Sequence, residues 1–168
     1  MTHRLILTRH TKSSYDDPLL PDIERPLNPR GIKSAAKLGV WLTSRGDLPD
    51  EILCSPARRT QDTWAGIAAH MPDQHADLRV IPALYQASAE AMLAVLQTAT
   101  FRLVMMLGHN PDIASFAHQL CARPPIDPGF AHYPTGATLV LEFDIATWAE
   151  ARFGVGQVID FITPRDLE

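Results

Sequence analysis

The chain has 168 residues, of which 46% are hydrophobic and 20% charged, and its formal net charge is −4 at pH 7. A chain of this length and composition is expected to form one domain, residues 1–168, around one sizeable core. The negative charge and the lack of a concentrated basic segment argue against a nucleic-acid partner, because a phosphate backbone is normally met by a basic face. A few arginines close together can still bind a small anion.

Two cysteines, Cys54 and Cys121, are too few for a disulfide framework in a chain of this size. They are expected to be reduced, buried thiols. The apolar run before Arg9 is too short for a signal peptide or a membrane span. The sequence therefore predicts a cytoplasmic protein without a membrane partner.

In chain order, short apolar runs alternate with helical patterns, which is typical of an α/β domain with a largely parallel sheet. Strands are expected at residues 5–7, 51–54, 79–81, 103–107 and 138–143, and an edge strand at 157–162.

The first helix has a clear start and end. Asn28 and Pro29 supply an N-cap and a first-turn proline, and Gly46 is placed to end the helix. Its core face is expected to carry Ile32, Ala35, Leu38 and Leu42.

Two further pairs, Ser55-Pro56 and Asn110-Pro111, repeat this pattern of an N-cap and a proline. The apolar residues that follow them have helical spacing and indicate core faces. These residues are Trp64, Ile67, Ala68 and Met71 in one helix and Ile113, Phe116, Ala117 and Leu120 in the other. A further helix is expected at residues 89–98.

Two segments are predicted to be loops, residues 16–26 and 124–129. The first is rich in charge and follows Arg9 and His10, so it could fold over a site formed there.

Polar residues follow three of the expected strands. They are Arg9 and His10 after the first, residues 55–59 (SPARR) after the second, and His109 after the strand at 103–107. Ligands of open parallel sheets bind outside the carboxyl ends of the strands, where helix N-termini also present free N–H groups. The three groups are therefore expected to converge at one edge of the sheet.

Four sequence blocks carry a family resemblance. Residues 8–11 (TRHT), 25–31 (RPLNPRG), 55–63 (SPARRTQDT) and 107–111 (LGHNP) resemble the histidine phosphatase superfamily. The short chain and the RPLN block are most similar to SixA-type phosphohistidine phosphatases. The resemblance extends to the tail at 163–167 and implies a three-layer α/β/α sandwich like that of phosphoglycerate mutase, with a mostly parallel sheet and one antiparallel edge strand.

The resemblance also implies roles for individual residues. His10 would be the nucleophile that takes the phosphoryl group, Arg9, Arg59 and His109 would line the phosphate pocket, and Arg25 would add a further contact. The family pattern Ser-Pro-x-x-Arg selects Arg59, although the neighbouring Arg58 is the alternative assignment. No metal and no organic cofactor is implied.

These residue types suit phosphoryl transfer on physical grounds. The transferring group spreads negative charge over its oxygens, so catalysis depends on positioning and fixed positive charge. An arginine stays protonated and presents a planar fork to two oxygens at once. A neutral histidine offers a free nitrogen lone pair, and a hydrogen bond from its other ring nitrogen to a carbonyl near residues 25–31 is expected to fix the tautomer.

The general acid is the least determined role. Glu90 is the only carboxylate of residues 83–90, and it is interpreted as part of a first helical turn. Phosphohistidine has a better leaving group than an alcohol, so the lack of an acid there favours cleavage of an N–P bond. Asp22 matches an aspartate of the SixA-type pattern and could protonate or orient the leaving nitrogen, or it could be a solvated loop carboxylate. Asp16, Asp17 and Glu24 are assigned to solvation of the loop.

Thr11 departs from the commonest pattern, in which Gly or Ala follows the histidine. It is expected to narrow the pocket floor or to add a hydroxyl group there. The remaining histidines have no metal-ligand spacing; His3, His70, His75 and His132 are expected in loops or at the surface, and His118 on a helix.

The expected function is that of a phosphatase acting through a phosphohistidine intermediate, with a phosphohistidine-bearing protein as substrate and partner. Three alternatives remain open at this point. One is a phosphatase of small phosphate esters, the second a non-catalytic phosphate-binding module, and the third a metal-dependent hydrolase, which the cationic strand ends disfavour.

Overall fold

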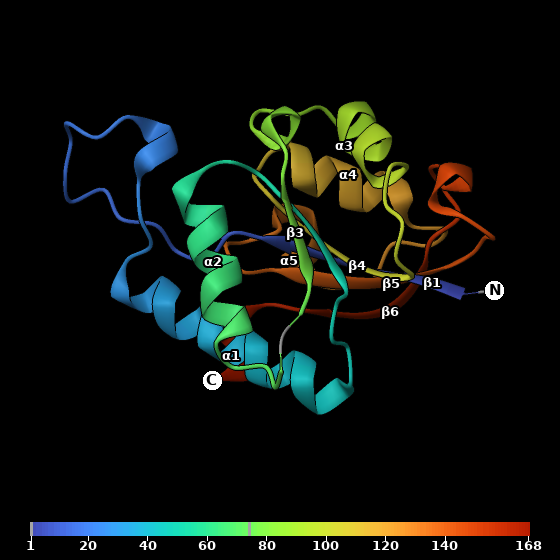
Figure 1. Ribbon diagram of the computed structural model, residues 1–168, viewed down its shortest axis with the longest axis horizontal. Helices are drawn as coiled ribbons and strands as arrows, with labels where there is room; N and C mark the ends of the chain where they lie inside the picture. The colour runs from blue at the N-terminus through green and yellow to red at the C-terminus, as the bar shows by residue number, and fades with distance from the viewer. Residues whose placement is uncertain (1, 74) are drawn as a thin grey trace.

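The computed structural model describes residues 2–73 and 75–168. Six strands form one sheet in the order β3-β2-β4-β1-β5-β6, with helices on both of its faces (Figure 1). The strands are β1 (Thr2–Arg9), β2 (Glu51–Cys54), β3 (Asp77–Val80), β4 (Leu103–Gly108), β5 (Thr138–Asp144) and β6 (Gln157–Ile162).

Strand direction follows the predicted sheet. β1 pairs in parallel with β4, β4 with β2, and β2 with β3. The edge strand β6 pairs antiparallel with β5, as expected, and β5 also pairs antiparallel with β1. The predicted α/β/α fold with a mostly parallel sheet is confirmed.

The helices are α1 (Pro29–Arg45), α2 (Arg58–Ala68), α3 (Ala89–Leu96), α4 (Asp112–Leu120) and α5 (Pro128–His132). Four short 3₁₀ turns accompany them: η1 (Asp22–Glu24), η2 (Pro82–Leu84), η3 (Trp148–Glu150) and η4 (Pro164–Leu167).

Two apolar clusters lie on opposite faces of the sheet, because successive strand side chains point to opposite sides. Leu5 and Leu7 of β1 belong to the cluster that contains residues of α3, α4 and α5. Ile6, between them, belongs to the cluster that contains residues of α1 and α2. In Figure 1, α1 and α2 lie on the side of the sheet away from α3 and α4.

The start of α1 has the predicted cap. The side chain of Asn28 accepts a hydrogen bond from the Gly31 N–H at 2.8 Å, and Gly46 ends the helix in the left-handed region at φ 74°. The predicted core face needs one correction. Ala35, Leu38 and Leu42 are fully buried, whereas Ile32 is 58% exposed. The buried face begins instead at Gly31, which packs against the backbone of Lys12.

The two other predicted caps are wrong. Helix α2 begins at Arg58, after Ala57, and no side chain caps it; α4 begins at Asp112, after Pro111, also without a side-chain cap. The Asn110 side chain is turned to other partners: its Nδ2 group donates to the carbonyl oxygens of His132 and Tyr133, and its Oδ1 atom accepts no hydrogen bond from the described residues.

Other boundaries shift by small amounts. Strand β3 starts two residues earlier than expected. The predicted loop at 124–129 ends at Pro128, where α5 begins, and the Asp127 side chain caps this helix by accepting from the Gly129 N–H. The predicted loop at 16–26 contains the turn η1. Helix α3 ends at Leu96, earlier than the expected residue 98.

Both cysteines are free and buried, as predicted. Burial raises the pKa of the Cys54 thiol to about 12 and that of Cys121 to about 11. Across residues 2–73 and 75–168, none of the helices has the length and apolar character needed to cross a bilayer.

Candidate active site

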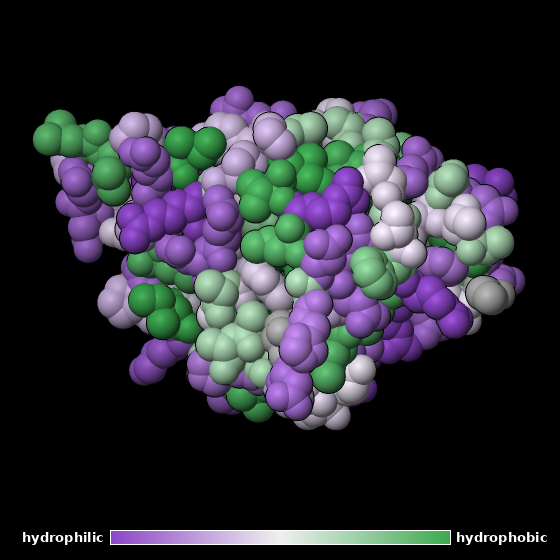
Figure 2. All heavy atoms as spheres, viewed as in Figure 1, coloured by the Kyte–Doolittle hydropathy of each residue, from purple (hydrophilic) through white to green (hydrophobic). Residues whose placement is uncertain are grey.

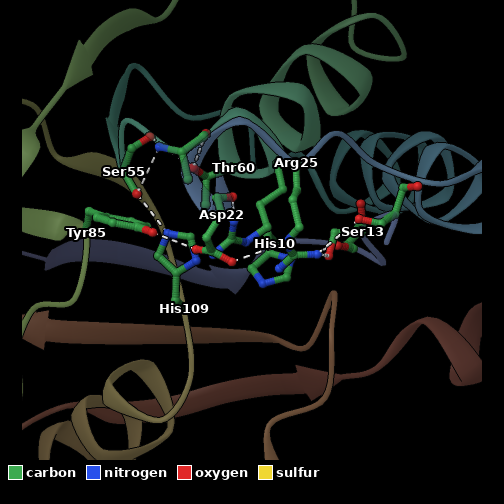
Figure 3. A network of polar contacts seen from close by, with 12 residues as sticks. His10, Ser13, Asp22, Arg25, Ser55, Thr60, Tyr85 and His109 are labelled. Atoms are coloured by element: carbon green, nitrogen blue, oxygen red, sulfur yellow. Dashed lines mark hydrogen bonds and ion pairs between the residues drawn. The ribbon is translucent and has the colours of Figure 1, made fainter. Parts of the chain in front are cut away.

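The carboxyl ends of β1, β2 and β4 meet at one edge of the sheet and bring together the three groups of polar residues that follow them. A cavity of about 220 Å³ lies there, and Arg9, His10, Arg25, Arg59 and His109 are among the residues that line it. Figure 3 shows His10, Asp22, Arg25 and His109 brought together from separate elements, with Asp22 between Arg25 and the His109 ring. The predicted convergence is therefore observed.

His10 follows β1 and is almost completely buried. Its Nδ1 atom lies 2.7 Å from the carbonyl oxygen of Thr11. Burial, with smaller contributions from the nearby His109, Arg9 and Arg59 and against the opposing effect of the Thr11 carbonyl, lowers the pKa of His10 to about 3. A neutral ring that donates from Nδ1 carries its free lone pair on Nε2, which is the state required of a nucleophile.

The expected partner of His10 was a carbonyl near residues 25–31, and this prediction is wrong. The acceptor belongs to Thr11, although the predicted segment lies directly behind it. The Asn28 N–H donates to the Lys12 carbonyl at 3.0 Å, and a Cβ atom on Gly31 would come within 2.0 Å of the same oxygen. The segment therefore supports the backbone that holds His10.

Two arginines and a histidine present unsatisfied hydrogen-bond donors around the cavity. The Nε atoms of Arg9 and Arg59 and the Nδ1 atom of His109 are buried without a hydrogen-bond partner. Buried polar groups are normally paired, because an unpaired buried donor costs about 1–3 kcal/mol. An arrangement of this kind is chemically suited to an oxyanion, although Asn110 Oδ1, an acceptor, is also unpartnered at this cavity.

His109 follows β4 and lies with its ring centroid 5.3 Å from that of His10. Its Nε2 atom is 2.7 Å from the hydroxyl oxygen of Ser55, which also accepts from the Ala57 N–H at 3.3 Å. If the Ser55 hydroxyl donates to Nε2, the ring proton lies on Nδ1. Burial first, and then Arg59, lowers the pKa of His109 to about 4. His109 is therefore a neutral donor near pH 7.

Asp22 in η1 joins both flanking arginines. Its carboxylate accepts from Arg25 Nε at 3.1 Å, from Arg59 Nη2 at 3.0 Å and from the Tyr85 hydroxyl at 2.6 Å. The Tyr85 hydrogen bond, followed by those of Arg25 and Arg59, holds the pKa of Asp22 well below its usual range. Such a carboxylate is suited to orienting the arginines and poorly suited to donating a proton.

Arg25 is held on its other side as well. Its Nη1 atom donates to the Ser13 hydroxyl at 2.7 Å and to the Ser14 carbonyl at 3.2 Å, and its guanidinium lies 4.0 Å from the centroid of the Tyr15 ring. Arg25 thus brings the C-terminal end of the 16–26 segment to the cavity and joins it to residues 13–15.

The structure distinguishes between the two neighbouring arginines of α2. The Arg59 side chain is 7% exposed and faces the cavity, whereas that of Arg58 is 58% exposed and pairs with Asp62 at 3.5 Å. Glu90 is exposed in the first turn of α3, as interpreted. No carboxylate of the described residues lines the cavity.

Thr11 does not take the expected place at the pocket floor. Its backbone N–H donates to the Thr63 hydroxyl at 3.1 Å, and its own hydroxyl lies 3.3 Å from the same atom. Thr63 in turn donates to the Arg59 carbonyl at 2.6 Å. Thr11 therefore links the segment after β1 to α2 instead of shaping the cavity.

Three residues of the site were missed in the sequence. Ser55 stands in a motif block but was assigned to a helix N-cap, and Thr63 matches a helix interior equally well. Tyr85 lies in the segment 83–90, where an aromatic residue next to Leu84 is typical of a core position. Its ring packs edge-on against His109, with centroids 5.7 Å apart.

The remaining histidines lie away from the cavity. His70, His75, His118 and His132 are exposed, which agrees with the expectation. His3 was expected at the surface but is buried in β1, where its ring packs against Trp148 at 5.2 Å. Within the described residues, no three His, Cys, Asp or Glu side chains are placed to hold a metal ion.

Comparisons with known proteins agree with this geometry. A sequence model of the histidine phosphatase superfamily (branch 1) matches residues 5–86. The uncharacterized protein Rv1276c of Mycobacterium tuberculosis is 32% identical over 162 residues, which cover 94% of this chain and 99% of that protein.

Two solved structures are similar over nearly the whole chain. The "putative phosphohistidine phosphatase SixA" from Nakamurella multipartitia has 26% identity and a TM-score of 0.82, covering 98% of this chain and 97% of that one. The protein of the same description from Agrobacterium tumefaciens has 26% identity and a TM-score of 0.77, covering 96% and 98%. With the motif blocks gathered at one cavity, these matches show that the chain belongs to the histidine phosphatase superfamily, whose members are phosphatases.

Proposed function

We propose that this protein removes the phosphoryl group from phosphohistidine in proteins, through a covalent intermediate on His10. The observation that carries the proposal is the set of unpartnered donors of Arg9, Arg59 and His109 around a cavity that also holds His10. The similarity to structures described as SixA phosphohistidine phosphatases supports the substrate class.

The first step is attack of His10 Nε2 on phosphorus. The N–P bond of the substrate breaks, and its imidazole leaves with the bonding electron pair, neutral because its remote nitrogen is already protonated. The His10 ring then bears both the phosphoryl group and the Nδ1 proton and is positively charged. Its hydrogen bond to the Thr11 carbonyl becomes charge-assisted at this stage, which stabilises the intermediate.

In the second step a water oxygen attacks phosphorus and the His10 N–P bond breaks. The ring recovers its lone pair, inorganic phosphate leaves, and the extra proton of the water passes to phosphate oxygen or solvent. The arginines stabilise the charge on the equatorial oxygens in both steps. Neither step requires a protein acid, which fits a cavity that no described carboxylate lines and an Asp22 whose pKa is lowered.

An ester substrate places a different demand on the site. An alkoxide is a poor leaving group and needs a proton, and no carboxyl group of the described residues lines the cavity to donate one. This is the reason for preferring phosphohistidine to small phosphate esters. We also place the activity in the cytoplasm, which two free cysteines support.

The test compares initial rates on a phosphohistidine peptide, an aryl phosphate and a sugar phosphate. We expect the phosphohistidine peptide to be preferred and the sugar phosphate to be turned over slowest. Rapid quenching should trap an acid-labile, alkali-stable phosphoryl label that is absent from His10→Ala. Equal rates on all three substrates would contradict the assigned substrate class, and the absence of label would contradict the His10 intermediate.

A further inference from the structure

A second and larger cavity adjoins the phosphate pocket. It has a volume of about 510 Å³, against about 220 Å³ for the pocket, and Lys12 and Thr135 line both. From there it extends between the start of α1 and the C-terminal turn η4, which pack together in the fold and lie side by side in Figure 1. We call this cavity the flanking groove.

Three cations line the flanking groove: Lys12, Arg30 and Arg165. All three are exposed, and none makes an ion pair or a side-chain hydrogen bond with another described residue. Arg30 also lies in the first turn of α1, where the partial positive charge of the helix N-terminus adds to its own. The concentration of unpaired cations contrasts with the net charge of −4 of the whole chain.

The two carboxylates of the groove are already engaged in local structure. Asp127 Oδ1 accepts from the Gly129 N–H at 2.8 Å, and Asp166 Oδ2 accepts from the Thr163 N–H at 2.8 Å. Neither pairs with Lys12, Arg30 or Arg165. The cations therefore remain available to an anion from outside the chain.

The walls of the groove favour an extended chain. Pro128, Pro134 and Pro164 line it and provide rigid apolar surface. The phosphoryl group of a small phosphate occupies only the smaller pocket, so such a substrate leaves the groove unused. A polypeptide whose phosphohistidine enters the pocket has to continue past Lys12 and Thr135. Beyond these two residues the flanking groove offers the larger space for the rest of that polypeptide.

We propose that the flanking groove binds an acidic segment of the substrate protein next to the phosphohistidine, through Lys12, Arg30 and Arg165. The proposal rests on the phosphohistidine phosphatase activity proposed above and specifies its substrate. Because exposed charge pairs contribute little individually, the three cations together are expected to favour acidic over neutral flanks by about tenfold.

The test measures binding and turnover separately. Binding uses a peptide with a hydrolysis-resistant phosphonate analogue of phosphohistidine, made once with Asp and Glu flanks and once with Asn and Gln flanks. The wild-type protein should bind the acidic form about tenfold more tightly. The Arg30→Glu/Arg165→Glu variant should lose this preference, and Arg30→Gln/Arg165→Gln should lose most of it. Raising the salt concentration from about 0.05 M to about 0.5 M should reduce the preference, since exposed charges are screened.

The matched control is Arg123→Glu, which changes the net charge by the same two units as Arg30→Gln/Arg165→Gln but alters an exposed arginine that does not line the groove. This variant should keep the preference for acidic flanks, and it tests whether a change in net charge alone removes that preference. Equal affinity of the wild type for both peptides, or a preference that survives in Arg30→Glu/Arg165→Glu, would overturn the proposal. If the protein turns over phosphohistidine peptides without any flank preference, the proposed function is supported and the proposed role of the groove is contradicted. If it binds acidic flanks preferentially but turns over neither peptide, the role of the groove is supported and the proposed function is contradicted.

Discussion

The Nδ1 atom of His10 lies 2.7 Å from the carbonyl oxygen of Thr11, the next residue of the chain. A carbonyl only accepts hydrogen bonds, so this contact requires a proton on Nδ1 and leaves the lone pair on Nε2. The proposed nucleophile is thus oriented by its own backbone, and the position of that backbone depends on Gly31 and Asn28 behind it.

Both histidines of the cavity should stay neutral at pH values well below the usual pKa of a histidine. Burial lowers the pKa of His10 to about 3 and that of His109 to about 4, against about 6.5 in an unfolded peptide. An NMR titration of the imidazole protons of the folded protein should show neither ring titrating between pH 5 and 8. The urea-unfolded protein is the control, and either ring titrating near 6.5 in the folded state would contradict the prediction.

The same lowered pKa values make stability depend on pH. Between about pH 4 and 6.5 the unfolded chain binds protons at these histidines that the folded chain does not, so the free energy of unfolding falls as the pH is lowered. At pH 5 each histidine should lower the free energy of unfolding by about 2 kcal/mol relative to pH 8. Urea unfolding at several pH values measures the slope, which should be shallower in His10→Asn/His109→Asn.

The two arginines at the start of α2 form a matched pair for mutation. Arg59→Ala removes a guanidinium that lines the cavity and should lower kcat/KM by about 10²–10³. Arg58→Ala removes an exposed side chain and should leave kcat/KM within about twofold. Initial rates on an aryl phosphate measure both. A larger loss in the Arg58 variant than in the Arg59 variant would reverse the assignment.

Asp22→Asn tests whether this carboxylate orients the arginines or supplies a proton. It weakens hydrogen bonds to Arg25 and Arg59 from a half-exposed position, so kcat/KM should fall by about tenfold. Because the lowered pKa of Asp22 argues against proton donation, the loss should be similar for aryl and alkyl phosphates. A much larger loss for the alkyl phosphate, whose leaving group needs a proton, would identify Asp22 as an acid. Tyr85→Phe removes only the hydroxyl and should show a smaller loss of the same kind.

Gly31→Ala should disturb the site through the backbone. A Cβ atom there would lie 2.0 Å from the Lys12 carbonyl oxygen, so the segment that carries the Thr11 carbonyl has to move. We expect a loss of about 1–3 kcal/mol in the free energy of unfolding, together with reduced activity. Gly108→Ala is the comparison, because its Cβ would meet only side chains at ordinary contact distances, Met92 at 3.5 Å and Ile113 at 3.8 Å. Similar stability losses in the two variants would argue against the steric explanation.

Much of the fold and of the cavity follows from local sequence patterns. Apolar runs and cap residues determine where β1, β2, β4 and α1 form, and parallel strands end at the same edge of a sheet. The residues after those strands, Arg9, His10, Arg59 and His109, were therefore expected to meet. The choice of Arg59 over Arg58 came from the Ser-Pro-x-x-Arg pattern of the family that the sequence resembles. In the structure Arg59 lines the cavity and Arg58 does not, since neighbouring helix positions point about 100° apart.

Other features depended on how distant segments pack. Ile32 lies outside the core because Gly31 approaches the Lys12 backbone and sets the rotation of α1. Asp22 meets Tyr85 across 63 positions of sequence, through the path of a loop that has no periodic pattern. The Thr11 carbonyl became the partner of His10 through a turn of the backbone. The sequence by itself determined which chemical groups reach the edge of the sheet, and tertiary packing decided which hydrogen bonds orient them, because those bonds join segments whose separation no local pattern encodes.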